Sequence, residues 1–323
     1  MGKKRKRFQK EIKKQPKEVR SGLDKFYHDY YKQLLIIPLL MLIIAIAIIG
    51  LNFLQTGTLV QTGVSLSGGL TLTVSISDPI DHLALSNRLS EELPNDILVR
   101  ETVEFGVQRA VTIQAAPMTQ EEDLSALEDN VVAITTEFIP ELSTQDYTAE
   151  IVGPSLGRAF LQQTVFALIF AFFLMSVVVF YYFRSFIPSF AIVLAAFSNM
   201  IVTLAAVIVL DIRLSTAGIA AFLMLIGYSV DTDILLTTRV LKRKGKSVYD
   251  RIKSAIGTGL LMNASTLAAI TASLLVTRSE AIQQIMIILF IGLIVDMINT
   301  WIQNAGILRW YAEKVEAQGG DKK

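Results

Sequence analysis

Residues 214–236 read LSTAGIAAFLMLIGYSVDTDILL, and this stretch is the one from which the fold is best inferred. It is long and apolar enough to cross a bilayer as a helix, yet it contains Asp231 and Asp233. An ionised Asp near the centre of a spanning helix costs about 2.5–3.5 kcal/mol, so such residues normally face a bundle interior, a partner or water. We therefore expect the activity of the chain to depend on its membrane part.

The chain contains six apolar blocks of this length. Its 323 residues are 52% hydrophobic, and the apolar residues are gathered into blocks rather than scattered. Windows of about 19 residues predict membrane spans at 34–54, 159–183, 190–210, 214–236, 256–276 and 282–308. The first block is too long for a signal peptide and has no small-residue cleavage site, so we expect it to remain as an anchor.

Charge is distributed unequally along the chain and predicts its orientation. The first 20 residues contain ten Lys or Arg, whereas residues 55–158 contain sixteen acids and four Arg. Because basic segments stay in the cytoplasm, we expect a basic cytoplasmic leader at 1–33, an exterior domain at 55–158, a five-helix bundle at 159–308 and a cytoplasmic tail at 309–323. The leader lacks a series of interleaved aromatic residues, which favours contact with membrane lipid and argues against nucleic acid.

The exterior segment has the composition of a small soluble domain. Apolar spacing predicts strands at 70–76, 97–103, 106–114 and 147–152, and helices at 80–93 and 121–138. This β-α-β-β-α-β order predicts a ferredoxin-like α+β sandwich with helices on one face of the sheet, leaving the other face and the loop 101–105 for contact. Gly153-Pro154-Ser155 predicts a stiff hinge into the second span, with Ser155 as the helix cap.

Composition argues against several classes of site. Cysteine is absent, which excludes disulfides and Cys-ligated metals, and His28 and His82 are too few for a metal site. Gly245-Lys246-Ser247 resembles the end of a phosphate-binding loop, but Val240 stands where an earlier Gly is required. We therefore expect no metal, no cofactor and no enzymatic activity.

Asp231 and Asp233 point about 200° apart on a regular helix, so both cannot enter one cavity. Asp233 is closer to the cytoplasmic interface, and we expect it to reach water there. We expect Asp231 to be the buried acid, with Gly227 one turn earlier admitting a neighbouring helix on the same face. Arg239, about two turns from Asp231, is either an interfacial anchor or the partner of an acid.

Polar residues at helical spacing also occur in the last two spans. They are Gly292, Asp296, Asn299, Thr300 and Gln303 in the sixth span, and Thr258, Asn263, Ser265 and Thr266 in the fifth. Their side chains serve either as hydrogen-bonding contacts between helices or as the lining of a narrow wet path. A carboxylate at mid-membrane can bind and release a proton, so we expect Asp231 to be functional and leave both interpretations open for Asp296.

Three segments of the chain carry recognisable motifs: residues 63–69 (GVSLSGG), residues 152–157 (VGPSLG) and the sequence from Ile226 through the acids to Arg239. Together they resemble the SecF family of protein-export membrane proteins. Residues 63–69 are similar to its Gly-x-Asp-Phe-x-Gly-Gly element, although Ser65 and Leu66 replace the Asp and Phe. Residues 152–157 (VGPSLG) are similar to its element before the second span. The sequence from Ile226 through the acids to Arg239 resembles its fourth-span signature, in a form closer to SecD or archaeal members. Counterparts of the family's structural residues are Gly63, Gly68, Gly69, Gly153, Pro154 and Gly157.

The resemblance implies a function in protein export. It implies a six-span half of the resistance-nodulation-division superfamily that pairs with SecD beside the SecYEG channel in the cytoplasmic membrane. It further implies that the exterior domain contacts a translocating polypeptide and that proton movement powers changes of shape. Proton movement would then involve Asp231, Asp233, Arg239 and Asp296, supported by Gly227, Tyr228, Thr258, Asn263, Thr266 and Asn299.

Three other interpretations remain at this stage. The chain is alternatively half of a proton-driven exporter of small molecules or lipids from the same superfamily. A third candidate is an intramembrane aspartyl protease that uses Asp231 and Asp296, although neither acid lies in the Gly-x-Gly-Asp element usual for such proteases. In the fourth interpretation the chain only stabilises its partner.

Overall fold

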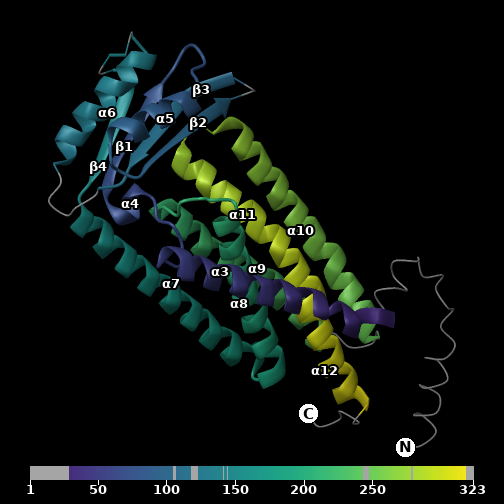
Figure 1. The fold of residues 1–323 in the computed structure, drawn as a ribbon. Coiled ribbons are helices and arrows are strands. Elements are labelled where there is room, and N and C mark those ends of the chain that lie inside the picture. The colour runs from purple at the N-terminus through teal and green to yellow at the C-terminus, as the bar shows by residue number, and fades with distance from the viewer. Residues whose placement is uncertain are drawn as a thin grey trace, which may run out of the picture.

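The computed structural model describes residues 29–104, 107–117, 123–140, 142–143, 145–242, 247–277 and 279–317. Most of the predicted basic leader, Phe105 of the predicted contact loop and the basic residues at 243–246 lie outside the described residues. Within the described part, six helices are long and apolar enough to cross a membrane, and a small antiparallel sheet lies at one end of the molecule (Figure 1).

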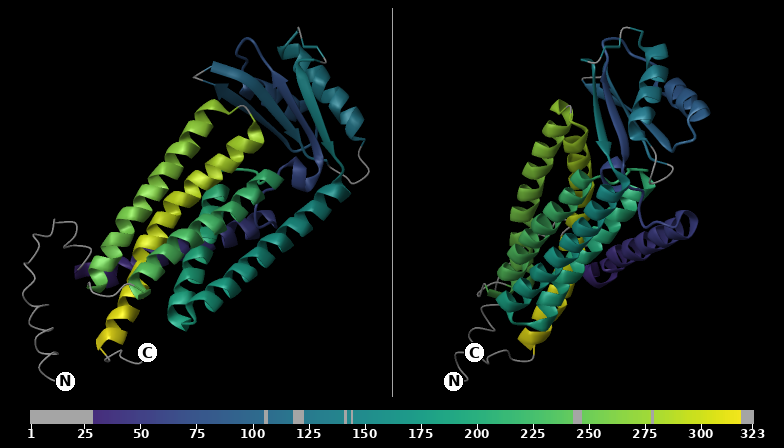
Figure 2. Two further views of the ribbon diagram at one scale, coloured as in Figure 1. Left: turned by 180° about the vertical axis from the view of Figure 1, so that it is seen from behind. Right: turned by 90° about the vertical axis from the view of Figure 1, so that its left-hand side faces the viewer.

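The long helices form one bundle. They are α3 (Ile36–Thr56), α7 (Pro154–Phe183), α8 (Phe186–Val209), α9 (Thr216–Lys242), α10 (Val248–Val276) and α11 (Glu280–Ile298), which continues through the π-helical segment η1 (Asn299–Asn304) into α12 (Ala305–Ala317). α3 crosses the other helices obliquely on one side of the bundle (Figure 2). Several helices extend beyond the predicted spans because the apolar windows detect only the part at lipid depth; α9, for example, continues to Lys242.

The sheet domain alternates strands and helices in the predicted order. Its elements are α4 (Val64–Ser67), β1 (Gly69–Ser75), α5 (His82–Glu92), β2 (Ile97–Glu104), β3 (Val107–Ala115), α6 (Leu124–Phe138) and β4 (Tyr147–Val152). The four strands are antiparallel in the order β2-β3-β1-β4. Asp81 and Asp123 cap α5 and α6, because each carboxylate accepts hydrogen bonds from two backbone N–H groups of the first turn.

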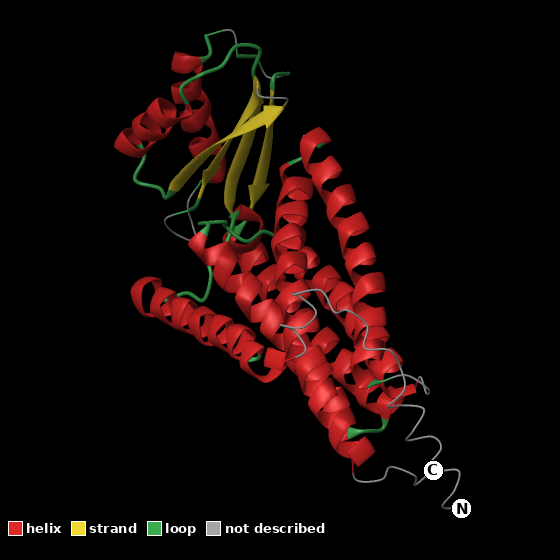
Figure 3. Cartoon of the chain, turned by 90° about the vertical axis from the view of Figure 1, so that its right-hand side faces the viewer, coloured by secondary structure: helices red, strands yellow, loops and turns green. Residues whose placement is uncertain are grey.

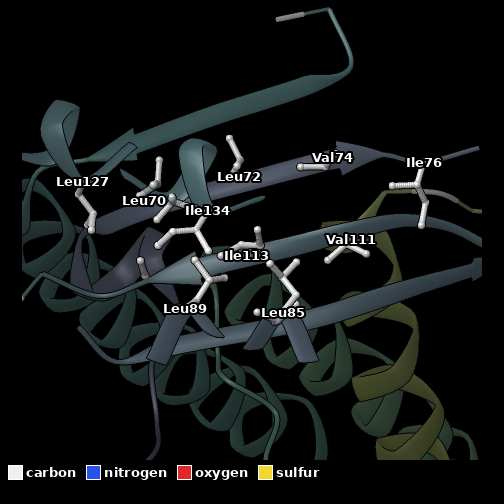
Figure 4. Close-up of a cluster of buried hydrophobic side chains, with 13 residues drawn as sticks. Leu70, Leu72, Val74, Ile76, Leu85, Leu89, Val111, Ile113, Leu127 and Ile134 are labelled. Carbon is white, nitrogen blue, oxygen red and sulfur yellow. The ribbon is translucent and has the colours of Figure 1, made fainter. Parts of the chain in front are cut away.

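The core of the domain lies between the sheet and its two helices. Alternate residues of β1, Leu70, Leu72 and Val74, are fully buried, and they face Leu85 and Leu89 of α5 (Figure 4). This period of two is the one expected for a strand with one buried face. The sheet therefore has one face covered by α5 and α6 (Figure 3).

The other face of the sheet points toward the bundle. Gln114 follows the core residue Ile113, so it lies on the opposite face, and its Nε2 donates to Oε1 of Glu280 at the start of α11 (2.9 Å). Arg100 similarly donates to the backbone oxygen of Asp211 (3.0 Å). An ion pair between Arg213 and Asp96 (2.9 Å) joins the same two regions. The face without helices is thus occupied in part by the chain's own α8–α9 loop and α11.

The junction between domain and bundle is built from two of the glycine-rich segments. Gly68 has φ +87°, and a Cβ there would lie 2.6 Å from Cα of Pro154. A Cβ on Gly157 would lie 2.6 Å from the backbone N of Gly68. α4 therefore contacts the first turn of α7 backbone to backbone, an approach that only glycine permits. Ser155 is not the cap of α7, contrary to expectation: Gly153 occupies the N-cap position and Pro154 is the first helical residue.

Candidate functional site at a buried acid pair

Asp233, not Asp231, is the buried acid of α9. Asp233 is 0% exposed, whereas Asp231 lies on the outer surface of the bundle with Gly227 and Tyr228. The expectation that Asp231 is buried is therefore wrong. It rested on Gly227 marking the packed face, but a Cβ on Gly227 would meet no atom within 4 Å. The packed face is instead the one that carries Ser229, Asp233 and Leu236.

Asp296 of α11 lies beside Asp233 in the same buried region. Asp296 is 0% exposed, and its carboxylate is close enough to interact electrostatically with that of Asp233. Thr232 donates from Oγ1 to Oδ2 of Asp296 (3.2 Å), and Asn199 of α8 donates from Nδ2 to Oδ1 (3.4 Å). Thr300 donates to the same Oδ1 (3.4 Å). Three helices therefore meet at one carboxylate.

The partner of Asp233 comes from the end of the π-helical segment. Asn304 is fully buried and donates from Nδ2 to Oδ1 of Asp233 (2.7 Å), while Oδ2 of Asp233 has no hydrogen-bond partner among the residues that the structure describes. In a regular helix Asn304 would lie about 80° round the axis from Asp296. The wider π turn allows both side chains to face α9, and π-helical turns in other proteins often occur at functional sites.

Neither acid forms an ion pair with any residue that the structure describes. Arg239 lies six residues beyond Asp233, a rise of about 9 Å, and it donates to the backbone oxygen and Oγ of Ser254 on α10. The structure therefore does not bring Arg239 to the acids. The hydrogen-bond partners of the pair are neutral side chains.

The fifth span contributes less than the sequence predicts. Thr258 and Thr266 bond to backbone oxygens of their own helix, at Ser254 (3.5 Å) and Met262 (3.1 Å). Only Asn263 of the expected α10 set is buried, at 4% exposed. In the sixth span Asn299, Thr300 and Gln303 are all buried, and Gln303 donates to Ser198 of α8 (3.3 Å).

Three site residues were not predicted. Thr232 and Asn199 donate to Asp296, and Asn304 donates to Asp233, but sequence spacing did not single them out. Asn199 could have been found, because Ser198-Asn199 interrupts an otherwise apolar span. Asn304 could not, because its orientation depends on the π turn. Asp231 and Asp296, the pair required for a protease, are not brought together, since one is exposed and the other fully buried.

The acid pair lies between two apolar clusters. We call the first the domain-side cluster: Leu66, Val207, Leu214, Ile219, Ala221, Phe222, Leu225, Ile270, Ile288, Leu289 and Leu293. We call the second the terminal-side cluster: Leu236, Val240, Val248, Ile252, Ala255, Trp301, Ala305, Leu308 and Ala312. Along α9 the order is Leu225, Asp233, Leu236, and along the last helix it is Leu293, Asp296, Trp301. Apolar side chains therefore separate the pair from both ends of the bundle.

Comparison with known sequences identifies relatives over most of the chain. Residues 132–314 match the family described as "Protein export membrane protein SecD/SecF, C-terminal". The chain is 38% identical to the protein-export membrane protein SecF of Methanolacinia petrolearia, covering 88% of this chain and 94% of that protein. It is 36% identical to SecF of Pyrococcus furiosus, covering 89% and 93%.

Comparison with solved structures identifies the same fold. The crystal structure of SecDF, a translocon-associated membrane protein from Thermus thermophilus, superimposes with a TM-score of 0.71 at 17% identity over 91% of this chain. A second SecDF structure, in a super-membrane-facing form, gives 0.55 at 18% identity. The chain spans 39% of the length of each SecDF chain. The sequence matches, over nearly the full length of the curated relatives, show that the chain belongs to the SecF family of protein-export membrane proteins.

Proposed function

We propose that the chain is an accessory subunit of the Sec protein-export machinery that pairs with SecD and promotes polypeptide translocation with energy from protons bound at Asp233 and Asp296. The observation that carries this proposal is the full burial of two adjacent carboxylates whose hydrogen-bond partners are neutral. The names of the archaeal relatives support the export role.

The chemistry of the pair favours proton binding. Two carboxylates side by side in a bundle interior repel each other, and each loses several kcal/mol of hydration when it is charged. A bound proton removes one charge and turns one oxygen into a donor. A proton on Oδ1 of Asp233 or Oδ2 of Asp296 must displace or reorient the donor already there, Asn304 or Thr232, whereas a proton on Oδ2 of Asp233 adds a donor that needs an acceptor. In either case the binding of a proton changes the contacts between α9 and the last helix.

Such a change does work only if the bundle has two states with different proton affinity. The acid pair contacts α8, α9, α11 and η1, so its protonation affects most of the bundle at once. α9 and α11 begin directly below the sheet domain, at Thr216 and Glu280. A shift between these helices would move the domain that we propose contacts the translocating polypeptide.

Asp231 fits an interface with SecD. It lies on an outer stripe of α9 with Met224, Gly227 and Tyr228, where a carboxylate at membrane depth needs a polar or charged partner. Gly227 leaves room for a second helix to approach this stripe closely. We propose that a SecD helix covers the stripe and supplies the partner of Asp231.

The sheet domain is best assigned as ferredoxin-like and exterior. The strand order β2-β3-β1-β4, with two helices on one face, supports the first assignment. The acidic composition of residues 55–158 supports the second, as do Lys242, Arg251 and Arg309 at the opposite end of the bundle. On this basis the protein lies in the cytoplasmic membrane beside SecYEG and anionic lipid, with both termini in the cytoplasm.

Matched substitutions on one helix test the proton pair. In vesicles that contain SecYEG, SecD and the full chain, we expect Asp233→Asn and Asp296→Asn to abolish the stimulation of precursor translocation by a proton gradient. Both variants should still copurify with SecD, because Asn keeps the size of the side chain. Asp231→Asn is the control: it should reduce copurification with SecD but keep the stimulation per assembled complex. Full stimulation in Asp233→Asn would exclude the proposed role of the pair.

A further inference from the structure

The tightest contact below the acid pair joins η1 to α10. Trp301 of η1 is only 6% exposed, and its indole ring lies directly against Gly259 of α10. A Cβ on Gly259 would overlap the ring atoms Cζ2 and Cη2. α10 can therefore approach η1 this closely only because residue 259 has no side chain.

This contact lies between the acid pair and the terminal end of the bundle. Trp301 is part of the terminal-side cluster, five residues beyond Asp296 and three before Asn304, which donates to Asp233. Gly259 lies one turn from Asn263, a buried polar residue of α10. The indole thus occupies the layer that a proton must cross to travel between Asp233 and the terminal side.

Beyond Gly259, α10 is less buried than the two helices against which it packs. Its apolar part is 17% buried, against 56% for α9 and 50% for the helix that contains α11 and η1, whereas its first turns are held by Arg251, which donates to the backbone oxygen of Val240 (2.6 Å) and pairs with Glu316. Thr258 and Thr266 bond within α10 itself, so these polar groups need no new partner if the helix shifts. Arg239, which donates to Ser254, is a second contact that must break.

We propose that the Trp301–Gly259 contact is a latch that closes the acid pair to the cytoplasmic side. When α10 moves away from η1, the indole of Trp301 loses its contact with Gly259 and water reaches Asp233. When α10 returns, the contact forms again and water is excluded from the acid pair. Trp301 is then a positioning residue, because it also fixes the turn that holds Asn304 against Asp233. The latch rests on the proposed function, in which protons reach this pair.

An accessibility measurement tests the latch. The natural chain has no cysteine, so Thr237→Cys gives a single thiol at a fully buried position one turn beyond Asp233. The full chain is assembled with SecD in inverted vesicles, and a charged, membrane-impermeant maleimide is added from the cytoplasmic face. We expect Gly259→Ala to accelerate labelling, because the added methyl group destabilises the closed contact. The acceleration should be about 5- to 150-fold, the factor that corresponds to the usual free-energy cost of overpacking a buried contact.

Two further variants make the result specific. Gly257→Ala lies on the same helix, and a Cβ there would meet nothing within 4 Å, so its labelling rate should equal that of the parent. Adding Trp301→Phe to Gly259→Ala removes the ring atoms that clash and should slow labelling again. A merely structural defect in α10 would not be reversed in this way.

The proposal is overturned if Gly259→Ala and Gly257→Ala label at the same rate while both copurify with SecD. If Gly259→Ala does not assemble, Trp301→Phe alone decides: faster labelling supports the latch and an unchanged rate overturns it. Labelling requires neither a proton gradient nor a precursor. The latch and the proton role of Asp233 can therefore fail separately.

Discussion

At the scale of single residues, Ser65 connects segments that are far apart in the sequence. Its Oγ accepts a hydrogen bond from the backbone N–H of Thr216 (3.1 Å), at the first residue of α9. Ser65 thereby caps a helix that begins 151 residues later. Its neighbour Leu66 is fully buried in the domain-side cluster. The family element to which residues 63–69 are similar has Asp and Phe at these positions, so Ser and Leu here keep one acceptor and one apolar anchor.

Substitution of Ser65 should change the stability of the first turn of α9. Ser65→Ala removes the acceptor, and we expect a loss of about 1 kcal/mol, the usual value for a lost cap. Ser65→Asp should keep or increase stability, because a carboxylate at a helix N-terminus interacts favourably with the helix dipole. Amide hydrogen exchange of the turn after Thr216 measures both effects. Equal exchange in the two variants would show that residue 65 is not a cap.

The acid pair shows what sequence can predict at this scale. The cost of a charge in a membrane span directed attention to the region of Asp233 and to Asp296, and both acids are buried in the structure, although Asp233 was expected to reach water. Choosing between Asp231 and Asp233 required the rotation of α9, and that rotation is set by the packing of α9 against α8 and α11. The period of the helix shows only that the two acids point apart. Gly227 was an unreliable guide because glycine is also found where a helix faces outward.

At the scale of elements, the contact between α4 and α7 joins the domain to the membrane. α4 has only four residues and cannot be stable alone. It is held by the approach of Gly157 to the backbone of Ser67 and Gly68, and by the hydrogen bond from Gly63 N to the backbone oxygen of Leu214 (2.9 Å). This single contact therefore explains Gly68 of the first glycine-rich segment and Gly157 of the second.

Two glycines of α7 and its N-cap provide a matched test of this contact. Gly157→Ala places a Cβ 2.9 Å from the carbonyl carbon of Ser67. This neighbour is a backbone atom, so it cannot rotate away from the new methyl group as a flexible side chain could. We expect a loss of about 1–3 kcal/mol of stability. Gly153→Ala, at a position with φ −62° and open space, should have little effect. Thermal unfolding of the purified complex with SecD compares them; equal midpoints would contradict a close α4–α7 contact.

Element boundaries were predicted well where the pattern is local. β4 spans Tyr147–Val152 as expected, and the hairpin strands begin or end within one or two residues of their predicted limits. η1 was not predicted, because Asn299–Asn304 continues the 3.6-residue polar pattern of the helix before it. This segment packs against α10 with Trp301 directly at Gly259, a tertiary contact that no local pattern reports.

At the scale of the whole molecule, the sheet domain is attached to the bundle by a few polar contacts. Gln114 bonds to Glu280, Arg100 to the backbone of Asp211, and Arg213 to Asp96, of which Asp96 is 68% exposed. The contacts at Asp96 and Arg100 are open to solvent and contribute little to stability, whereas the Gln114–Glu280 hydrogen bond is partly buried. The arrangement therefore suits a domain that moves relative to the bundle around the α4–α7 junction.

Cross-linking across this interface should stop such movement. We expect a chain with Gln114→Cys and Glu280→Cys, joined by a short reducible thiol cross-linker, to lose precursor translocation and to regain it after reduction. The two single-cysteine variants, treated identically, control for modification of either side. If the cross-linked chain translocates at the uncross-linked rate, movement of the domain against α11 is not part of the export cycle.

The π-helical segment also limits how the length of the last helix can vary. A π turn contains one residue more than an α turn closes, so loss of one residue within η1 can be taken up by a regular α turn, and the residues after it nearly keep their rotation. A residue added between Asp296 and Arg309 would instead rotate everything after it by about 100°, and Arg309, which lies over the ring of Tyr31 at 4.1 Å, would then point elsewhere. Among related chains, insertions in this short interval should therefore be rarer than deletions of a single residue.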